Sequence, residues 1–287
     1  MRLSVSHTTR YSFARPVAQG MQRLRLKPKS THGQSVLDWT MELEGALPEV
    51  EYDDQHHNAT ALVSVLPGAR ELVISCRGVV DTCDNAGILG PHSGHMPLWC
   101  FLRQTPLTEP GPKMRALVGA LGGDLGRPLD KLHALSDLIR DAIAYEPGST
   151  HVRTRAEEAL AAGKGVCQDH AHTFIGAGRM LEIPMRYVSG YLKLDDRDDQ
   201  EAGHGWAEAH VDGLGWVGFD VANAICPGET YVRVATGCDY SDAAPITGLS
   251  RGSGETSLAV SVVVEQQSAA QAQQQGFGAS EQDQTSG

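Results

Sequence analysis

The chain has 287 residues, of which 41% are hydrophobic and 21% charged, values typical of a folded globular protein. Its net charge of −11, from 24 Lys and Arg against 35 Asp and Glu, repels nucleic acid and anionic lipid. No apolar run approaches the roughly 18 residues that a membrane span needs, and the N-terminus lacks the apolar region of a secretion signal. We therefore expect a cytoplasmic protein with no nucleic-acid and no membrane partner, and its six cysteines to be free thiols.

From residue 2 to about residue 80 the sequence shows the two-residue period of β-strands, and the first domain is expected to span 1–105. The stretch LDWTMEL alternates apolar and polar side chains, which predicts a strand with Leu37, Trp39, Met41 and Leu43 on one buried face. RLSVSH and RELVISCRGVV predict further strands, separated by turns with Pro and Gly. The basic residues of MQRLRLKPK alternate with apolar ones, which predicts an edge strand with a solvated basic face. We expect an N-terminal antiparallel β-sandwich-like domain.

A Pro- and Gly-rich stretch predicts a linker at residues 106–113, followed by a second domain at 114–264. Leucines, isoleucines and alanines between 129 and 143 recur every three or four residues, the stripe of an amphipathic helix. Thr154 and Glu157 fit a capping box of a further helix. MRYVSGYLK, HGWAEAHVD and WVGF predict strands, so the fold class is α+β. Residues 265–287 contain eight glutamines and predict a disordered tail.

The stretch GKGVCQDHAH gathers a cysteine, an acid and two histidines. On a helix, only His170 shares a face with Cys167, and two ligands are too few for a structural zinc. A nucleophile fits better. Gly163 and Gly165 end the preceding helix, so a new helix begins near Cys167, and a helix N-terminus favours a thiolate.

A nucleophilic cysteine also needs a base and a group that orients the base. His204 opens one predicted strand and Asp220 closes the next, with the turn DGLG between them. Two antiparallel strands of this length bring both residues to the same end of a hairpin. The candidate site is therefore Cys167 as nucleophile, His204 as base and Asp220 as orienting acid.

Other polar clusters receive structural interpretations. His170 and His172 are expected to pack inside the fold, and DDRDDQE at 195–201 to be a solvated acidic loop rather than a calcium site. Four potential zinc ligands at unusual spacing are expected to lie on a loop crossing between the domains: Cys83, His92, His95 and Cys100. We expect no metal and no cofactor.

Two long segments, RAEEALAAGKGVCQDHAHTFIGAGRMLEIPMRYVSGYL and HGWAEAHVDGLGWVGFDVAN, resemble the catalytic core of the bacterial transglutaminase-like family. Its members carry GVCQD, IPARYVSGYL, HAW-E and GWVGFDPTN in this order. HTTRYSFARPVAQGMQRLRLKP resembles the β-rich domain that precedes that core. The resemblance implies a papain-like transglutaminase core with Cys167, His204 and Asp220 in the roles named above. DVAN stands where the family has DPTN, which predicts a looser turn after Asp220.

Such a site transfers acyl groups. We expect a cysteine peptidase or amidase that acts on a peptide or protein amide. The alternatives are a protein-glutamine γ-glutamyltransferase, which cross-links glutamine to lysine or deamidates glutamine, and a binding module without catalysis. The backbone N–H of Cys167 would hold the oxyanion. His151 and Arg153 are candidates for its second donor.

Overall fold

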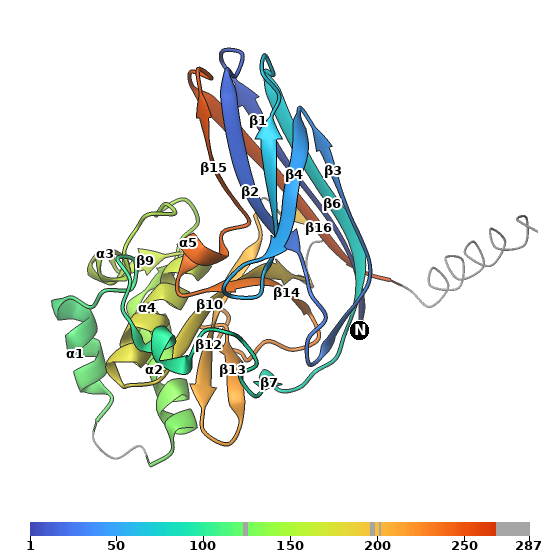
Figure 1. Cartoon of the computed structure of the whole chain (residues 1–287). Coiled ribbons are helices and arrows are strands. Elements are labelled where there is room, and N and C mark those ends of the chain that lie inside the picture. Colours follow the sequence, from blue (N-terminus) through green and yellow to red (C-terminus); the bar gives the residue numbers. More distant parts are fainter. Residues whose placement is uncertain (123–125, 196–198, 201, 268–287) are drawn as a thin grey trace, which may run out of the picture.

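The computed structural model describes residues 1–287 except 123–125, 196–198, 201 and 268–287. A β-sandwich forms one half of the molecule, and a sheet covered by helices forms the other (Figure 1). One sheet of the sandwich has the order β11-β16-β1-β6-β3, and the other has the order β15-β2-β5-β4. The strands are β1 (Arg2–Phe13), β2 (Gln19–Lys27), β3 (Gln34–Glu44), β4 (Ala46–Asp53), β5 (Ala59–Val65), β6 (Glu71–Thr82), β11 (Asp199–Gln200), β15 (Ile246–Arg251) and β16 (Thr256–Gln266).

The sandwich confirms the expected strands and corrects two details. Strand β3 shifts register between Val36 and Asp38, so Leu37 points outward and is 51% exposed. Strand β2 is not an edge strand, because it pairs with β15 on one side and β5 on the other. Its Arg25 is buried and forms an ion pair of 2.8 Å with Asp54 instead of facing solvent. Neither a bulge nor a buried ion pair changes the alternation of apolar and polar residues, so this alternation does not indicate them.

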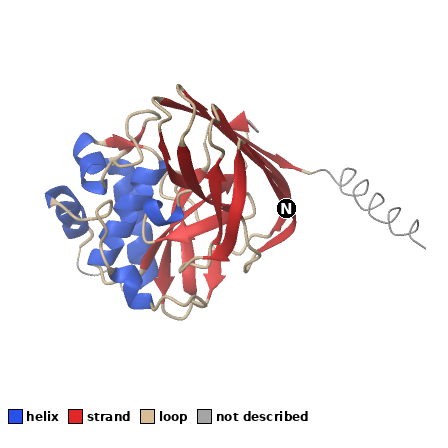
Figure 2. Cartoon of the chain, turned by 45° about the horizontal axis from the view of Figure 1, so that its top comes forward, coloured by secondary structure: helices blue, strands red, loops and turns tan. Residues whose placement is uncertain are grey.

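The second half is built on a five-stranded sheet with the order β14-β10-β12-β13-β7. Helices gather on one side of it, away from the sandwich (Figure 2). Helix α4 packs directly on β12 and β10 and is buried along almost its whole length. The elements are β7 (Ile88–Gly90), η1 (Leu98–Leu102), α1 (Pro112–Ala120), α2 (Pro128–Ala142), β8 (Ala144–Tyr145), α3 (Ala156–Ala162), β9 (Lys164–Gly165), α4 (Cys167–Met180), β10 (Met185–Leu192), β12 (His204–Val211), β13 (Gly215–Phe219), β14 (Tyr231–Gly237) and α5 (Tyr240–Ala243).

The helices follow the predicted pattern, with one change in capping. Helix α2 buries Leu132, Leu135 and Ile139 on the expected stripe. At the start of α3, the carboxylate of Glu158 accepts the N–H of Arg155, the N-cap residue, at 2.9 Å. Glu157 instead accepts three backbone N–H groups at the start of α1, at 2.7–3.0 Å. It therefore caps a different helix from the one that the sequence suggested.

The expected domain boundaries need three corrections. Strand β15 and most of β16 fall in the segment 114–264 but belong to the sandwich, so the second domain ends near residue 245. Strand β7 lies inside 1–105 but pairs with β13 of the second sheet. The predicted linker, 106–113, runs into α1 at Pro112. Of the predicted tail, Gln266 closes β16, and residues 268–287 lie outside the described residues.

Two side-chain amides join the halves along the free edge of β14. Gln34 accepts the N–H of Arg233 and donates to its carbonyl, both at 2.8 Å. Asn58 does the same at Thr236, at 2.8 and 2.7 Å. These buried backbone groups would otherwise lack partners at a sheet edge, so the amides replace a missing neighbouring strand. Both amides come from the sandwich, which fixes it against the second domain.

Across the described ranges, no helix combines the length and apolar character needed to cross a bilayer. All six cysteines are free thiols, as expected.

Candidate active site

The start of α4 places the thiol of Cys167 at a helix N-terminus, as predicted. Gly163 ends α3 in the left-handed conformation, with φ +68°. A Cβ on Gly165 would lie 2.7 Å from the Cβ of Asp169, so only glycine allows this approach. Asp169 accepts the N–H of Val166 at 2.8 Å and the hydroxyl of Thr150, and it caps the helix. Sequence reasoning missed this role, although an acid three residues into a helix is its usual signal.

The β12–β13 hairpin brings the two other predicted residues together. Ala207 of β12 pairs with Phe219 of β13, so His204 and Asp220 lie at the same end of the hairpin. Nε2 of His204 lies 2.6 Å from Oδ2 of Asp220. On its other side His204 faces Cys167, whose interaction with the imidazole acts to raise the pKa of His204. Because Nε2 is engaged by the carboxylate, Nδ1 is left to exchange a proton with the sulfur.

Charge and burial set the protonation of the pair. Burial would lower the pKa of His204, but the negative charge of Cys167 and hydrogen bonds to Asp220 and Cys167 raise it to about 10. Burial likewise acts to raise the pKa of Asp220, but its hydrogen bond to His204 and donors from Tyr231 and Asn223 lower it. The imidazole of His204 is therefore favoured in its protonated form at neutral pH, beside the ionised carboxylate of Asp220.

Tyr231 and Asn223 hold the carboxylate in place. The Tyr231 hydroxyl and the Asn223 amide each donate to Oδ2 of Asp220 at 2.7 Å. Two backbone hydrogen bonds between Asp220 and Ile225 close the turn, at 2.9 and 3.2 Å. The turn is thus closed without the family's proline, contrary to the loosening predicted from DVAN. In the sequence, the role of Asn223 was indicated only by its place in the DVAN motif, and nothing indicated the role of Tyr231.

Aromatic rings shield this hydrogen-bonded pair from water. The ring of Trp206 stacks on that of His204, with centroids 6.2 Å apart, and Tyr231 packs edge-on against Trp206 at 5.4 Å. Trp206 is 2% exposed and Asp220 1%. Low solvent access strengthens the interaction between the imidazole and the carboxylate.

The two histidines beside the nucleophile are structural, as expected. The ring nitrogens of His170 lie 2.9 Å from the carbonyl of Val166 and 3.0 Å from that of Ile143. Nε2 of His172 accepts the N–H of Tyr240 at 3.1 Å. Burial, aided by the charge of Arg179, lowers the pKa of His172 to about 3, so it is neutral.

The four possible zinc ligands of the 83–100 segment do not form a shared site. His92 contacts the carbonyl of Met96 and the indole of Trp216, and His95 stacks on His57 with centroids 4.3 Å apart. Within the described ranges, a single group of potential metal ligands is found, and it contains none of these four. Most of the acidic stretch 195–201 lies outside the described residues.

A cleft of about 770 Å³ opens beside the nucleophile. It is lined by Tyr145, Pro147, Gly148, Val166, Cys167, Leu192, Leu194, Ala202, Gly203, His204, Ala222, Asn223, Val260 and Ser261. Val260 and Ser261 belong to β16, so the sandwich supplies one wall. His151 and Arg153, the candidate oxyanion donors, are not among the lining residues. The N–H of Arg153 donates to Nδ1 of His151 at 3.2 Å instead.

A thiol on a buried helix, facing a histidine–acid pair on an antiparallel sheet, is the arrangement of papain-like enzymes. A "Putative Cysteine Protease" from Cytophaga hutchinsonii has the same fold. The two chains superpose with a TM-score of 0.73, at 23% identity, over 93% of this chain and 92% of the other.

The sequence comparisons define the family. Residues 115–221 match the transglutaminase-like superfamily, and residues 3–81 match the bacterial transglutaminase-like N-terminal region. The protein thus consists of a transglutaminase-like core joined to the N-terminal domain of its bacterial members, as the sequence motifs indicated. An uncharacterized protein of Mycobacterium leprae is 29% identical over 92% of this chain and 98% of its own length. One of Mycobacterium tuberculosis H37Rv is 26% identical over 90% of each chain.

Proposed function

We propose that the protein is a thiol acyl-transfer enzyme, a cysteine peptidase or amidase that cleaves a peptide or protein amide through a thioester on Cys167. One observation carries this proposal. His204 lies between the thiol of Cys167, which acts to raise the pKa of the imidazole, and the buried carboxylate of Asp220, which is 2.6 Å from its Nε2. This is the arrangement in which an imidazole can move protons between a nucleophile and a leaving group.

In the first half-reaction the thiolate of Cys167 attacks the amide carbonyl, and the C–N bond then breaks. The negative oxygen of the intermediate would accept the N–H of Cys167, because the first N–H groups of a helix have no partner within it. Nδ1 of His204 gives its proton to the departing nitrogen. The products are a free amine, or ammonia, and an acyl group on the sulfur.

In the second half-reaction His204, now neutral, takes a proton from water as the water oxygen attacks the thioester. The C–S bond breaks, a carboxylic acid leaves, and the thiolate–imidazolium pair is restored. The open cleft supports hydrolysis, since water has free access to the thioester. Asp220 keeps Nε2 protonated and the ring in place throughout.

A glutamine γ-glutamyltransferase is the second candidate, favoured by the family of the core. There the acyl donor is a glutamine side chain, ammonia leaves, and a lysine amine replaces water in the second step. The same three residues serve both reactions, so the acceptor alone separates them. A binding module without catalysis is disfavoured, because such a module would have no need of an intact triad.

Ammonia and new primary amines released from a library of glutamine peptides and peptide amides separate the candidates. A peptidase releases new amines, an amidase or deamidase releases ammonia, and a cross-linking enzyme consumes an added alkylamine. We expect hydrolysis that is lost in Cys167→Ala and retained in Cys226→Ser, a second partly buried thiol. Turnover that survives Cys167→Ala would overturn the proposal.

A further inference from the structure

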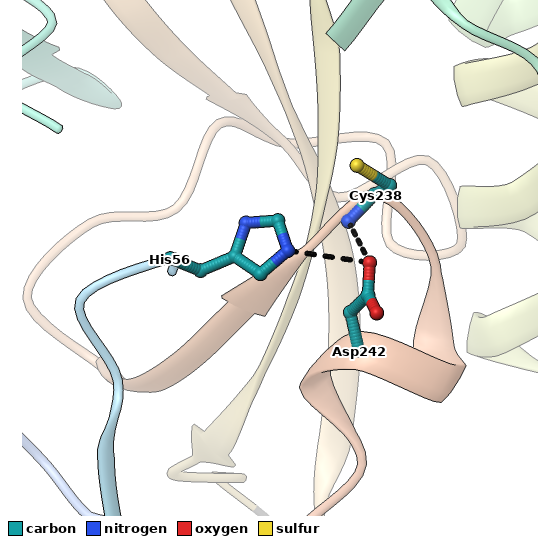
Figure 3. Close-up of side chains that lie close together, drawn as sticks. All are labelled: His56, Cys238 and Asp242. Carbon is teal, nitrogen blue, oxygen red and sulfur yellow. Dashed lines mark hydrogen bonds and ion pairs between the residues drawn. The ribbon is translucent and has the colours of Figure 1, made fainter. Parts of the chain in front are cut away.

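Three side chains of the types that bind metals converge at the junction of the two halves, and none of them lines the cleft. Ligand atoms of His56, Cys238 and Asp242 all lie within 4.8 Å of one another. His56 comes from the turn between β4 and β5 of the sandwich. Cys238 follows β14, and Asp242 lies on α5 (Figure 3). His56 and Asp242 are 186 positions apart in the sequence, so the group joins distant segments of the chain.

The imidazole and the carboxylate already face each other. Nε2 of His56 lies 3.2 Å from Oδ2 of Asp242, and the N–H of Cys238 donates to the same oxygen at 3.1 Å. The His56 side chain is 2% exposed, whereas that of Asp242 is 36% exposed. One side of the group is thus open enough for an ion to enter from solvent.

Neighbouring contacts fix the segments that carry the three side chains. Nη2 of Arg179, on the nucleophile's helix, donates to the carbonyl of Cys238 at 2.6 Å. Asp239 caps α5 by accepting the N–H of Ser241 at 2.7 Å. On the sandwich side, Asp54 accepts the N–H of His56 at 2.9 Å. Ligand segments held in this way lose little entropy when an ion binds.

We propose that His56, Cys238 and Asp242 bind one Zn²⁺ ion, which clamps the sandwich to the catalytic domain. Imidazole nitrogen, thiolate sulfur and carboxylate oxygen are the three ligand types that zinc takes from proteins, and sulfur excludes Mg²⁺ and Ca²⁺ as the preferred ions. Water would complete the tetrahedron on the exposed side. This site departs from the expectation of a protein without metal.

Charge balance favours this ion at a partly buried position. A Zn²⁺ ion with one thiolate and one carboxylate is neutral, which keeps the cost of burial small. The nearby guanidinium of Arg25 is already paired with Asp54, at 2.8 Å. Metal binding would displace the thiol proton and replace the His56–Asp242 hydrogen bond.

The test must keep zinc off the catalytic pair, because a thiol beside a histidine also binds this ion. Calorimetric titration of full-length Cys167→Ala with Zn²⁺ avoids that second site. We expect one ion per chain, and an affinity at least about 100-fold weaker after a further Cys238→Ser, since loss of a ligand exceeds the effect of losing a group that orients one. Cys83→Ser, an exposed thiol, is the matched control and should bind as before.

Cobalt gives a signature that a purely structural cysteine would not produce. With Co²⁺, the Cys167→Ala protein should show a thiolate-to-cobalt charge-transfer band that disappears in Cys238→Ser. Zinc should also raise the unfolding midpoint of the parent and leave that of the variant unchanged. His56→Gln serves if Cys238→Ser does not fold. Absence of binding, or equal affinity in parent and variants, would overturn the site whether or not the enzyme is active.

Discussion

Replacing Asp220 by Asn should weaken the pair that drives the chemistry while leaving its shape intact. The carboxylate is buried, lies 2.6 Å from Nε2 of His204 and accepts hydrogen bonds from Tyr231 and Asn223. An amide of the same size keeps the packing but removes the charge. The new amide can donate an N–H to Nε2 of His204. This favours the tautomer with its proton on Nδ1, which cannot accept a proton from the thiol. We expect kcat/KM to fall about 100- to 10,000-fold.

The pH profile provides the sharper readout. The pKa of His204, ordinarily 6.5, is raised to about 10, so the wild-type alkaline limb should lie near pH 10, where the imidazolium is lost. Without the Asp220 charge that limb should move down by about one to three pH units. The free energy of unfolding should also fall as the pH rises. The raised pKa of His204 contributes stability that is complete below pH 6.5 and is lost as the pH rises through about 10. The variant should lose less stability over that range.

Steady-state hydrolysis of an amide or activated ester between pH 5 and 11 measures this limb, with urea unfolding at each pH as the second assay. Asp212→Asn is the control, because Asp212 is exposed in the turn at the far end of the same hairpin. Its profile should match the wild type. An unchanged alkaline limb in Asp220→Asn, together with activity within twofold of the wild type, would refute the coupling between the two side chains.

Three further substitutions test the supports of the site. Tyr231→Phe removes a donor to a buried carboxylate; it should lower kcat about tenfold and cost about 1–3 kcal/mol in urea unfolding, and wild-type values of both would contradict its role. Gly165→Ala forces a Cβ against Asp169 and should cost about 1–3 kcal/mol in urea unfolding; an unchanged midpoint would contradict the close approach. Asn58→Ala leaves two backbone groups of β14 without partners and should cost about 2–4 kcal/mol, which equal stability would disprove.

The sequence predicted those parts of the site that depend on local order. A glycine pair followed by a helix places Cys167, and a short hairpin places His204 opposite Asp220, because strand length and turn type fix register. Asp169 occupies the third position of the helix, where an acid commonly caps the N-terminus, so its role also depends on local order. Periodicity likewise identified α2 and the central strands.

What the sequence could not show arises from contacts distant along the chain. Tyr231 reaches the carboxylate from β14, a strand contributed 11 residues after Asp220 and paired elsewhere in the sheet. Strand β16 returns to pair with β1, so the C-terminal part of the chain completes the N-terminal domain and walls the cleft. The burial of Arg25 depends on Asp54, whose proximity no alternation of residues could reveal. Pairing of this kind is decided by tertiary packing, which local patterns do not encode.

Mass spectrometry of the intact protein can detect the acyl group that Cys167 should carry during turnover. The enzyme is mixed with an activated ester or amide and quenched in acid within seconds, which preserves a thioester. We expect an added acyl mass that maps to Cys167, disappears on incubation at neutral pH, and is absent from Cys167→Ala. An acyl group on another residue, or wild-type turnover with no acyl-enzyme in samples quenched during the first turnover, would contradict this mechanism.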